Sequence, residues 1–227
     1  MNETFTHKEL SKKKDPEQVF ITVQFPVRGE KLPADHGYAL YSAISQIKPE
    51  LHGTKWLGVE LISGVQFDKG LIALPTRGAN LRLRIPADKF GEVISLAGKR
   101  LDIDGSIIRL GIPMARPLMP SATLYSRIVT IRGFMEVPEF LAAAQRQIAE
   151  LEINAGLELP KENRSRFRRI LTVKDKKIVG FSLIAHDLND KDSLKLQSHG
   201  IGGRRAMGCG LFNPIRKPFD FEGENNE

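Results

Sequence analysis

VFITVQFPV, at Val19–Val27, and LYSRIVTIRGF, at Leu124–Phe134, decide the fold, because each opens one half of the chain. Both runs are rich in β-branched and aromatic residues, which is typical of β-strands. Each is followed by a segment whose apolar residues recur with helical spacing. The order of expected elements therefore restarts near residue 124, and the chain is interpreted as two similar units.

The first unit continues with a helix over His36–Ile47, for which Asp35 is the expected capping residue. After it we expect strands near Gly58–Ile62, Gly70–Leu74 and Asn80–Ile85, a second helix from Pro86 to Gly98, and a hairpin over Arg100–Ile112. The hairpin turns at Asp104-Gly105, a pair that suits a tight turn with positive φ angles.

The second unit has a helix over Pro138–Leu151 and a similar series of elements. These are strands over Arg166–Val173 and Lys177–Ala185, a short helix over Asp190–Ser198, and a last strand over Ala206–Pro214. Each half thus runs strand, helix, strands, helix, strand, which is the order of the split βαβ unit. We predict an α+β protein of two ferredoxin-like (βαββαβ) domains in tandem. The expected divisions are a disordered tail at 1–16, domains at 17–114 and 115–218, and an acidic tail at 219–227.

Composition excludes several classes of protein. The chain has 227 residues, 41% hydrophobic and 27% charged, values that are ordinary for a globular protein. No apolar run is long enough to span a bilayer, and the polar N-terminus lacks the apolar centre of a secretory signal. A single cysteine, Cys209, excludes an internal disulfide and a multi-cysteine zinc site. We therefore expect a cytoplasmic protein without a membrane partner.

Positive charge is concentrated near the C-terminus. The net charge is +7, and the segment from Arg164 to Lys217 holds 13 basic and 4 acidic residues. This asymmetry favours a site for a polyanion, although a solvated basic face would have the same composition. On the expected strand over residues 166–173, Arg166 and Arg168 share one face and are candidate phosphate contacts. Lys176, in the turn that follows, is a weaker candidate, because an exposed edge strand also carries solvated charges.

The segment HGIGGRRAMGCGLF, at His199–Phe212, combines close glycines with paired arginines. Glycine adopts positive φ and leaves backbone N–H groups uncovered, and successive free N–H groups bind phosphate. Arginine adds planar donors that match phosphate oxygens. The segment predicts an anion clamp, and a tight turn with solvated arginines is the alternative. Its candidate RNA-binding residues are Gly200, Gly202, Gly203, Arg204, Arg205, Gly208 and Gly210.

The same segment resembles the C-terminal glycine-rich loop of the CRISPR-associated RAMP endoribonucleases that process precursor crRNA, and is most similar to the Myxan-type branch. LPADHGYALYSAISQI, at Leu32–Ile47, and the pair Leu51-His52 extend the resemblance from about Val19 to Pro214. The resemblance implies an endoribonuclease that cuts repeat RNA, with precursor crRNA as substrate, CRISPR effector-complex proteins as further partners, and no cofactor. A RAMP subunit that binds crRNA without cutting it is the alternative.

Metal-free cleavage would use the RNA 2′-hydroxyl as nucleophile, and histidine suits the proton transfers because it titrates near neutral pH. In the resembling family, the catalytic histidine commonly follows the first helix in a Leu-His pair, with a lysine shortly after. His52 and Lys55 match that pattern. Some relatives place the histidine near the start of the helix, which His36 would match, and we favour His52. Tyr38 and Tyr41, on the less apolar side of the helix, are further candidates.

A catalytic metal has little support in the sequence. Asp102 and Asp104 form a D-x-D pair, but the following Gly105 favours a hairpin turn over a set of metal ligands. The sequence contains neither a His-x-x-x-His motif nor a cysteine pair.

Overall fold

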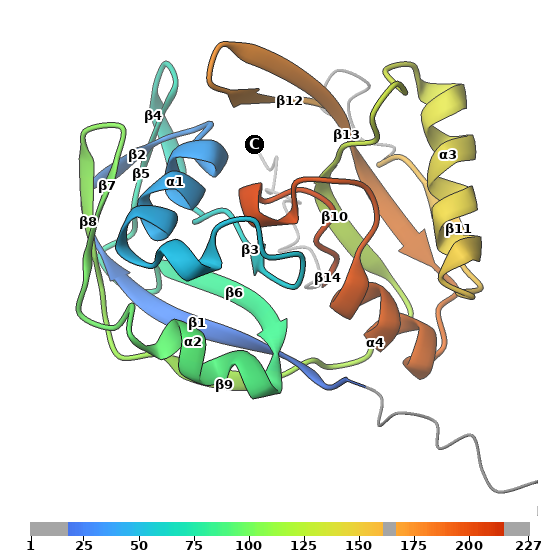
Figure 1. Ribbon diagram of the computed structural model, residues 1–227. Coiled ribbons are helices and arrows are strands. Elements are labelled where there is room, and N and C mark those ends of the chain that lie inside the picture. The colour runs from blue at the N-terminus through green and yellow to red at the C-terminus, as the bar shows by residue number, and fades with distance from the viewer. Residues whose placement is uncertain (1–17, 161–166, 216–227) are drawn as a thin grey trace, which may run out of the picture.

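The computed structural model describes residues 18–160 and 167–215, in which two main antiparallel sheets lie side by side (Figure 1). In the first, the order is β3-β6-β1-β8-β7. The strands are β1 (Phe20–Arg28), β3 (Gly58–Val59), β6 (Asn80–Pro86), β7 (Arg100–Ile103) and β8 (Ser106–Leu110). Helices α1 (Gly37–Ile47) and α2 (Phe90–Ile94) belong to the same unit, α2 following a 3-10 turn, η2 (Ala87–Lys89). This arrangement is the expected split βαβ unit.

The second sheet has the order β11-β13-β10-β14, and β12 pairs with β13 beside it. Its strands are β10 (Leu124–Val129), β11 (Gly156–Glu158), β12 (Arg168–Val173), β13 (Lys176–His186) and β14 (Asn213–Pro214). Helices α3 (Val137–Glu150) and α4 (Asp190–His199) complete the unit. The two domains thus repeat one topology, as predicted.

Alternation along the strands decides which residues form the core. On β6, Leu81, Leu83 and Ile85 are fully buried in the core of the first domain. Arg82 and Arg84, between them, point to the opposite face of the sheet. The second domain has its own core, in which Phe140 of α3 packs on Phe181 of β13 with 4.7 Å between ring centroids. Each sheet therefore has one face covered by its core and one face that turns away from it.

Several small elements were not predicted. Strands β2 (Lys31–Pro33) and β4 (Val65–Asp68) form a three-stranded sheet with β5 (Leu71–Ala73), which is the strand expected near Gly70–Leu74. Strand β9 (Met114–Pro117) pairs with β1, so the expected boundary between residues 114 and 115 falls inside a strand of the first sheet. None of the helices in the described ranges is long and apolar enough to cross a membrane.

Two local predictions were wrong. Asp35 does not cap α1: the capping position is His36, without a side-chain bond, and the Asp35 carboxylate accepts a hydrogen bond from the Thr172 N–H of β12 at 2.7 Å. The segment Ala206–Pro214 is not a strand. It begins inside a 3-10 turn, η3 (Arg205–Met207), and continues as a loop that ends in the two residues of β14. Non-local contacts outweigh the local pattern in both cases.

Candidate active site and anion-binding cleft

His52 lies at the surface, directly after a 3-10 turn, η1 (Pro49–Leu51), that follows α1. Its ring stacks on that of Tyr41, with centroids 5.6 Å apart and planes 19° apart. Tyr41 is buried, and its hydroxyl accepts a hydrogen bond from the Gly53 N–H at 2.7 Å. Tyr41 therefore fixes both the imidazole and the backbone beside it. Within residues 18–160 and 167–215, no hydrogen bond engages the ring nitrogens of His52, which leaves them open to solvent.

Two further groups lie in the same turn. The Thr54 hydroxyl donates to the Leu51 carbonyl at 3.0 Å, which closes the turn around His52. Lys55 is exposed, as expected of a group that could approach a phosphate. Tyr38 is half-buried one helical turn before Tyr41. The structure thus brings His52 and Tyr41 into contact and places Lys55 in the same exposed segment.

His36 has a different environment. Its side chain is 0% exposed, its Nδ1 is 2.7 Å from the Pro33 carbonyl, and its Nε2 accepts the Ile62 N–H at 3.1 Å. This pairing requires a neutral ring with the proton on Nδ1, and burial lowers the pKa of His36. Helix α1, about 16 Å long at 1.5 Å per residue, lies between the two histidines in the chain. The contacts of His36 fit a structural residue, because both of its ring nitrogens are engaged by the backbone and the side chain is buried.

The glycine loop, defined here as Ile201–Phe212, does not form the expected cradle of free glycine N–H groups. The N–H of Gly202 donates to Gln147 Oε1 at 2.7 Å, and that of Gly203 to the Thr130 carbonyl at 2.9 Å. The N–H groups of Gly200, Gly208 and Gly210 also donate to carbonyls of the protein, those of Leu196, Arg205 and Ile128. The expectation of free N–H groups is corrected: four of the five donate to other parts of the second domain, and that of Gly208 donates within the loop.

Close packing explains the glycines instead. Gly200, Gly202, Gly208 and Gly210 all have positive φ angles. A Cβ atom on Gly202 would lie 2.6 Å from the Thr130 carbonyl oxygen, and one on Gly208 would lie 2.7 Å from Leu61 Cγ. The loop therefore fits tightly between β10 and the first domain, as Figure 1 shows for the red segment between α1 and β10.

The two arginines of the loop have separate roles. Arg204, at φ +63°, is exposed and available to an anion. Arg205 is turned inward, and its Nη2 donates to the Ser198 carbonyl at 2.6 Å. Burial lowers the pKa of Arg205 to about 10. Of the pair, only Arg204 presents its charge to solvent.

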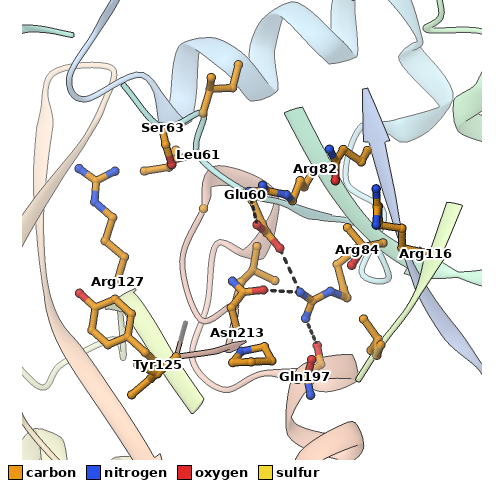
Figure 2. Close-up of a pocket in the computed structure, with 18 of the residues that line it drawn as sticks. Glu60, Leu61, Ser63, Arg82, Arg84, Arg116, Tyr125, Arg127, Gln197 and Asn213 are labelled. Atoms are coloured by element: carbon orange, nitrogen blue, oxygen red, sulfur yellow. Dashed lines mark hydrogen bonds and ion pairs between the residues drawn. The ribbon is translucent and has the colours of Figure 1, made fainter. Parts of the chain in front are cut away.

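A further group of positive charges lies in a cleft of about 900 Å³ between the two sheets. The faces that point away from the two cores form its walls, and five arginines line it against one acidic residue, Glu60 (Figure 2). They are Arg82, Arg84, Arg116, Arg127 and Arg169. None was singled out as a principal contact from the sequence. Arginines that alternate with apolar residues in an expected strand, as in NLRLRI at Asn80–Ile85, are the signal that could have identified them.

The basic strand pair is only partly described. Arg168 on β12 and Lys176 at the start of β13 are both exposed, whereas Arg166 lies outside the described residues. The next arginine along, Arg169, points into the cleft and donates from Nε to Ser182 Oγ at 3.4 Å. Between residues 18 and 160, and from 167 to 215, no three metal-ligating side chains gather into one group.

Solved structures similar to this fold include Cas6 proteins and a RAMP protein. A CRISPR-associated protein Cas6 superposes with a TM-score of 0.65 at 13% identity, covering 87% of this chain and all of that one. A RAMP protein described as binding different RNA substrates gives 0.63 at 14% identity, over 86% of this chain and all of that one. A Cas6-related protein from Pyrococcus furiosus gives 0.58 at 16% identity, over 88% and 99%. At these identities the likeness shows the fold alone, and it confirms the predicted tandem of ferredoxin-like domains.

Sequence comparison then identifies the family. The family model described as Cas6 Crispr matches residues 21–217. A CRISPR-associated endonuclease Cas6 from Myxococcus xanthus (strain DK1622) is 39% identical over 196 residues, which cover 86% of this chain and 82% of that protein. The chain belongs to the Cas6 family of CRISPR-associated endonucleases, as predicted from the glycine loop and the first helix.

Proposed function

We propose that this endonuclease cleaves CRISPR repeat RNA within precursor crRNA, without a metal ion. The RNA 2′-hydroxyl attacks the adjacent phosphate, and the products are a 2′,3′-cyclic phosphate and a 5′-hydroxyl. The family membership supports the substrate class, since the M. xanthus relative is named a CRISPR-associated endonuclease. The observation that carries the mechanism is the solvent-facing imidazole of His52, held on the buried ring of Tyr41.

His52 transfers a proton in this reaction, either from the attacking 2′-hydroxyl or to the departing 5′ oxygen. An imidazole suits that work because one ring nitrogen can accept a proton while the other donates one. Tyr41 acts as a positioning residue, since its ring and hydroxyl are already engaged by His52 and Gly53. Lys55, exposed in the same segment, supplies positive charge to the phosphate as negative charge develops on it.

The remaining basic residues hold the RNA. Arg116 and Arg127 face the cleft from the two sheets, and Arg204 extends from the glycine loop. Arg168 and Lys176 add exposed charge on the β12–β13 hairpin. Contacts of this kind go to phosphates, which set affinity and register but do not read bases directly.

Replacing the proposed catalyst tests this function. We expect His52→Ala to slow single-turnover cleavage of repeat RNA by about 10²–10⁴-fold, the usual contribution of a positioned acid or base. The Kd for the RNA should change little, because the proposed phosphate contacts remain. His186→Ala is the matched control, since His186 is a partly exposed histidine on β13 that pairs with Asp187.

Two results would contradict the proposal. Full activity in His52→Ala would place the catalyst elsewhere. Tight binding of repeat RNA by the wild-type protein with no cleavage would favour the alternative, a RAMP subunit that binds crRNA without cutting it.

A further inference from the structure

We infer that Arg84 is a positioning residue that holds both ends of the glycine loop from the opposite domain. Arg84 belongs to β6 of the first domain, and its side chain is 2% exposed. From there it reaches across to the second domain, where Figure 2 shows its guanidinium between Gln197 and Asn213. The effect of Arg84 on RNA binding rests on the proposed function, whereas its effect on the stability of the loop does not.

The hydrogen bonds of Arg84 bracket the loop. Nη1 donates to the Gln197 carbonyl at 2.7 Å, and Gln197 lies in the last turn of α4, four residues before the loop. Nη1 also donates to the carbonyl of Phe212 at 3.2 Å, and Nη2 donates to Asn213 Oδ1 at 2.6 Å. One side chain thus joins the segment that enters the loop to the segment that leaves it.

Arginine suits position 84 for two reasons, the shape of its guanidinium and the presence of Glu60 as a partner for its charge. A planar guanidinium can donate to acceptors on several sides at fixed angles, which a lysine ammonium on a flexible stem cannot reproduce. The fourth bond, from Nη2 to Glu60 Oε1 at 3.0 Å, offsets the cost of burying the cation. Arg82, two residues before it on the same strand, reaches only Glu60, at 3.7 Å, and no hydrogen bond of Arg82 to the loop is present in the described residues.

The loop held in this way also packs on the domain that carries His52. Gly37 of α1 lies so close to the Met207 carbonyl that a Cβ atom would clash with it, and Ala206 and Met207 pack on the core of the first domain. The position of the exposed Arg204 relative to His52 therefore depends on how firmly the loop is anchored. Arg84 anchors it at both ends.

Cys209 provides a direct measure of this anchoring, because it is the only cysteine of the chain, lies in the loop and is fully buried. In the full chain below the unfolding temperature, Ellman's reagent should label the wild-type thiol slowly. We expect Arg84→Lys to raise the labelling rate by roughly tenfold or more, since hydrogen bonds from a charged donor are strong enough to shift an opening equilibrium by that factor. Arg82→Lys is the matched control and should label at the wild-type rate.

A second variant covers the case in which Arg84→Lys does not fold. Asn213→Ala removes one acceptor at the exit of the loop and leaves Arg84 paired with Glu60, so it should raise labelling in the same direction by a smaller factor. An unchanged labelling rate in a folded Arg84→Lys or Asn213→Ala protein would overturn the inference. So would an equal rise in Arg82→Lys, because the effect would then not be specific to the loop bonds.

RNA measurements separate positioning from the proposed function. If the loop binds RNA, Arg84→Lys should raise the Kd for repeat RNA several-fold and leave the pH profile of cleavage at saturating RNA unchanged, since His52 is untouched. A purely structural role would not raise the Kd while leaving the pH profile of cleavage unchanged. Faster labelling with wild-type RNA affinity would support the anchoring by Arg84 and contradict the assignment of the loop to RNA binding.

Discussion

At the scale of single residues, the environments of two histidines at the ends of α1 decide their chemistry. The His36 ring lies between the Pro33 carbonyl and the Ile62 amide, so both nitrogens are used in holding the start of the helix. The His52 ring rests on Tyr41 with its nitrogens in solvent. The sequence places both residues beside the same helix but cannot show which imidazole faces inward, because that depends on packing against Ile62, which is 26 residues away.

His36 should make the stability of the protein depend on pH. Burial lowers its pKa in the folded state, so the unfolded state binds the proton more readily. The stabilising contribution is complete above the unfolded pKa of about 6.5 and is lost as pH falls from there through the folded pKa. Thermal unfolding of wild-type protein and His36→Gln between pH 8 and 5 should show a loss of stability on acidification that is smaller in the variant. Parallel pH dependence in the two proteins would contradict the assignment of His36 as a buried neutral residue.

At the scale of elements, the glycine loop depends on close approach to β10. Gly202 has a φ angle of +76°, and a Cβ atom there would clash with the Thr130 carbonyl oxygen. Gly203 has no positive φ, and a Cβ atom there would lie 4.0 Å from the nearest atom, the same oxygen. Gly202→Ala should therefore lower the free energy of unfolding by about 1–3 kcal/mol through backbone strain and the displaced Thr130 contact.

Gly203→Ala is the matched control for this prediction. It should change the free energy of unfolding by less than about 0.5 kcal/mol, as for a surface substitution, in the same urea titration. An equal loss of unfolding free energy in Gly202→Ala and Gly203→Ala would contradict this explanation. It would show that the φ angle and the space for a Cβ atom do not make glycine necessary at position 202.

Helices and strands with strong local periodicity were predictable from the sequence. Helix α3 and strand β6 lie within a residue or two of their expected bounds, because alternation and helical spacing are local signals. The last segment was not predictable in the same way. Ala206 and Met207 are apolar because they pack on the first domain, and the sequence pattern alone could not distinguish that packing from a strand.

At the scale of the whole molecule, the two sheets turn their open faces toward one cleft, and arginines line it from both sides. The sequence predicts the two domains but not the angle between them, so it does not show that Arg84 is buried between the domains. For the same reason, Arg116 and Arg127 could not be placed opposite each other before the structure was known. Local patterns define each unit, and long-range contacts define the site between them.

The cleft makes a salt-dependent prediction. Arg116→Gln and Arg127→Gln should each weaken binding of repeat RNA and reduce the slope of log K against log salt by about 0.7–0.9, the value for one phosphate contact. Arg146→Gln removes the same charge from α3, on the covered side of the second sheet, and should leave the slope unchanged. If all three variants reduced the salt slope equally, RNA binding would depend on the net charge of the protein and not on contacts in the cleft.

Metal-free cleavage of repeat RNA through its own 2′-hydroxyl can be tested with an RNA that lacks this group at the cut site. Purified full-length protein is incubated with its repeat RNA in excess EDTA, beside the same RNA with a single 2′-deoxy substitution at the cut site. We expect unchanged cleavage of the natural RNA to a 2′,3′-cyclic phosphate, and no cleavage of the substituted RNA, which lacks the nucleophile. Cleavage that stops in EDTA, or that continues at the deoxy site, would contradict it.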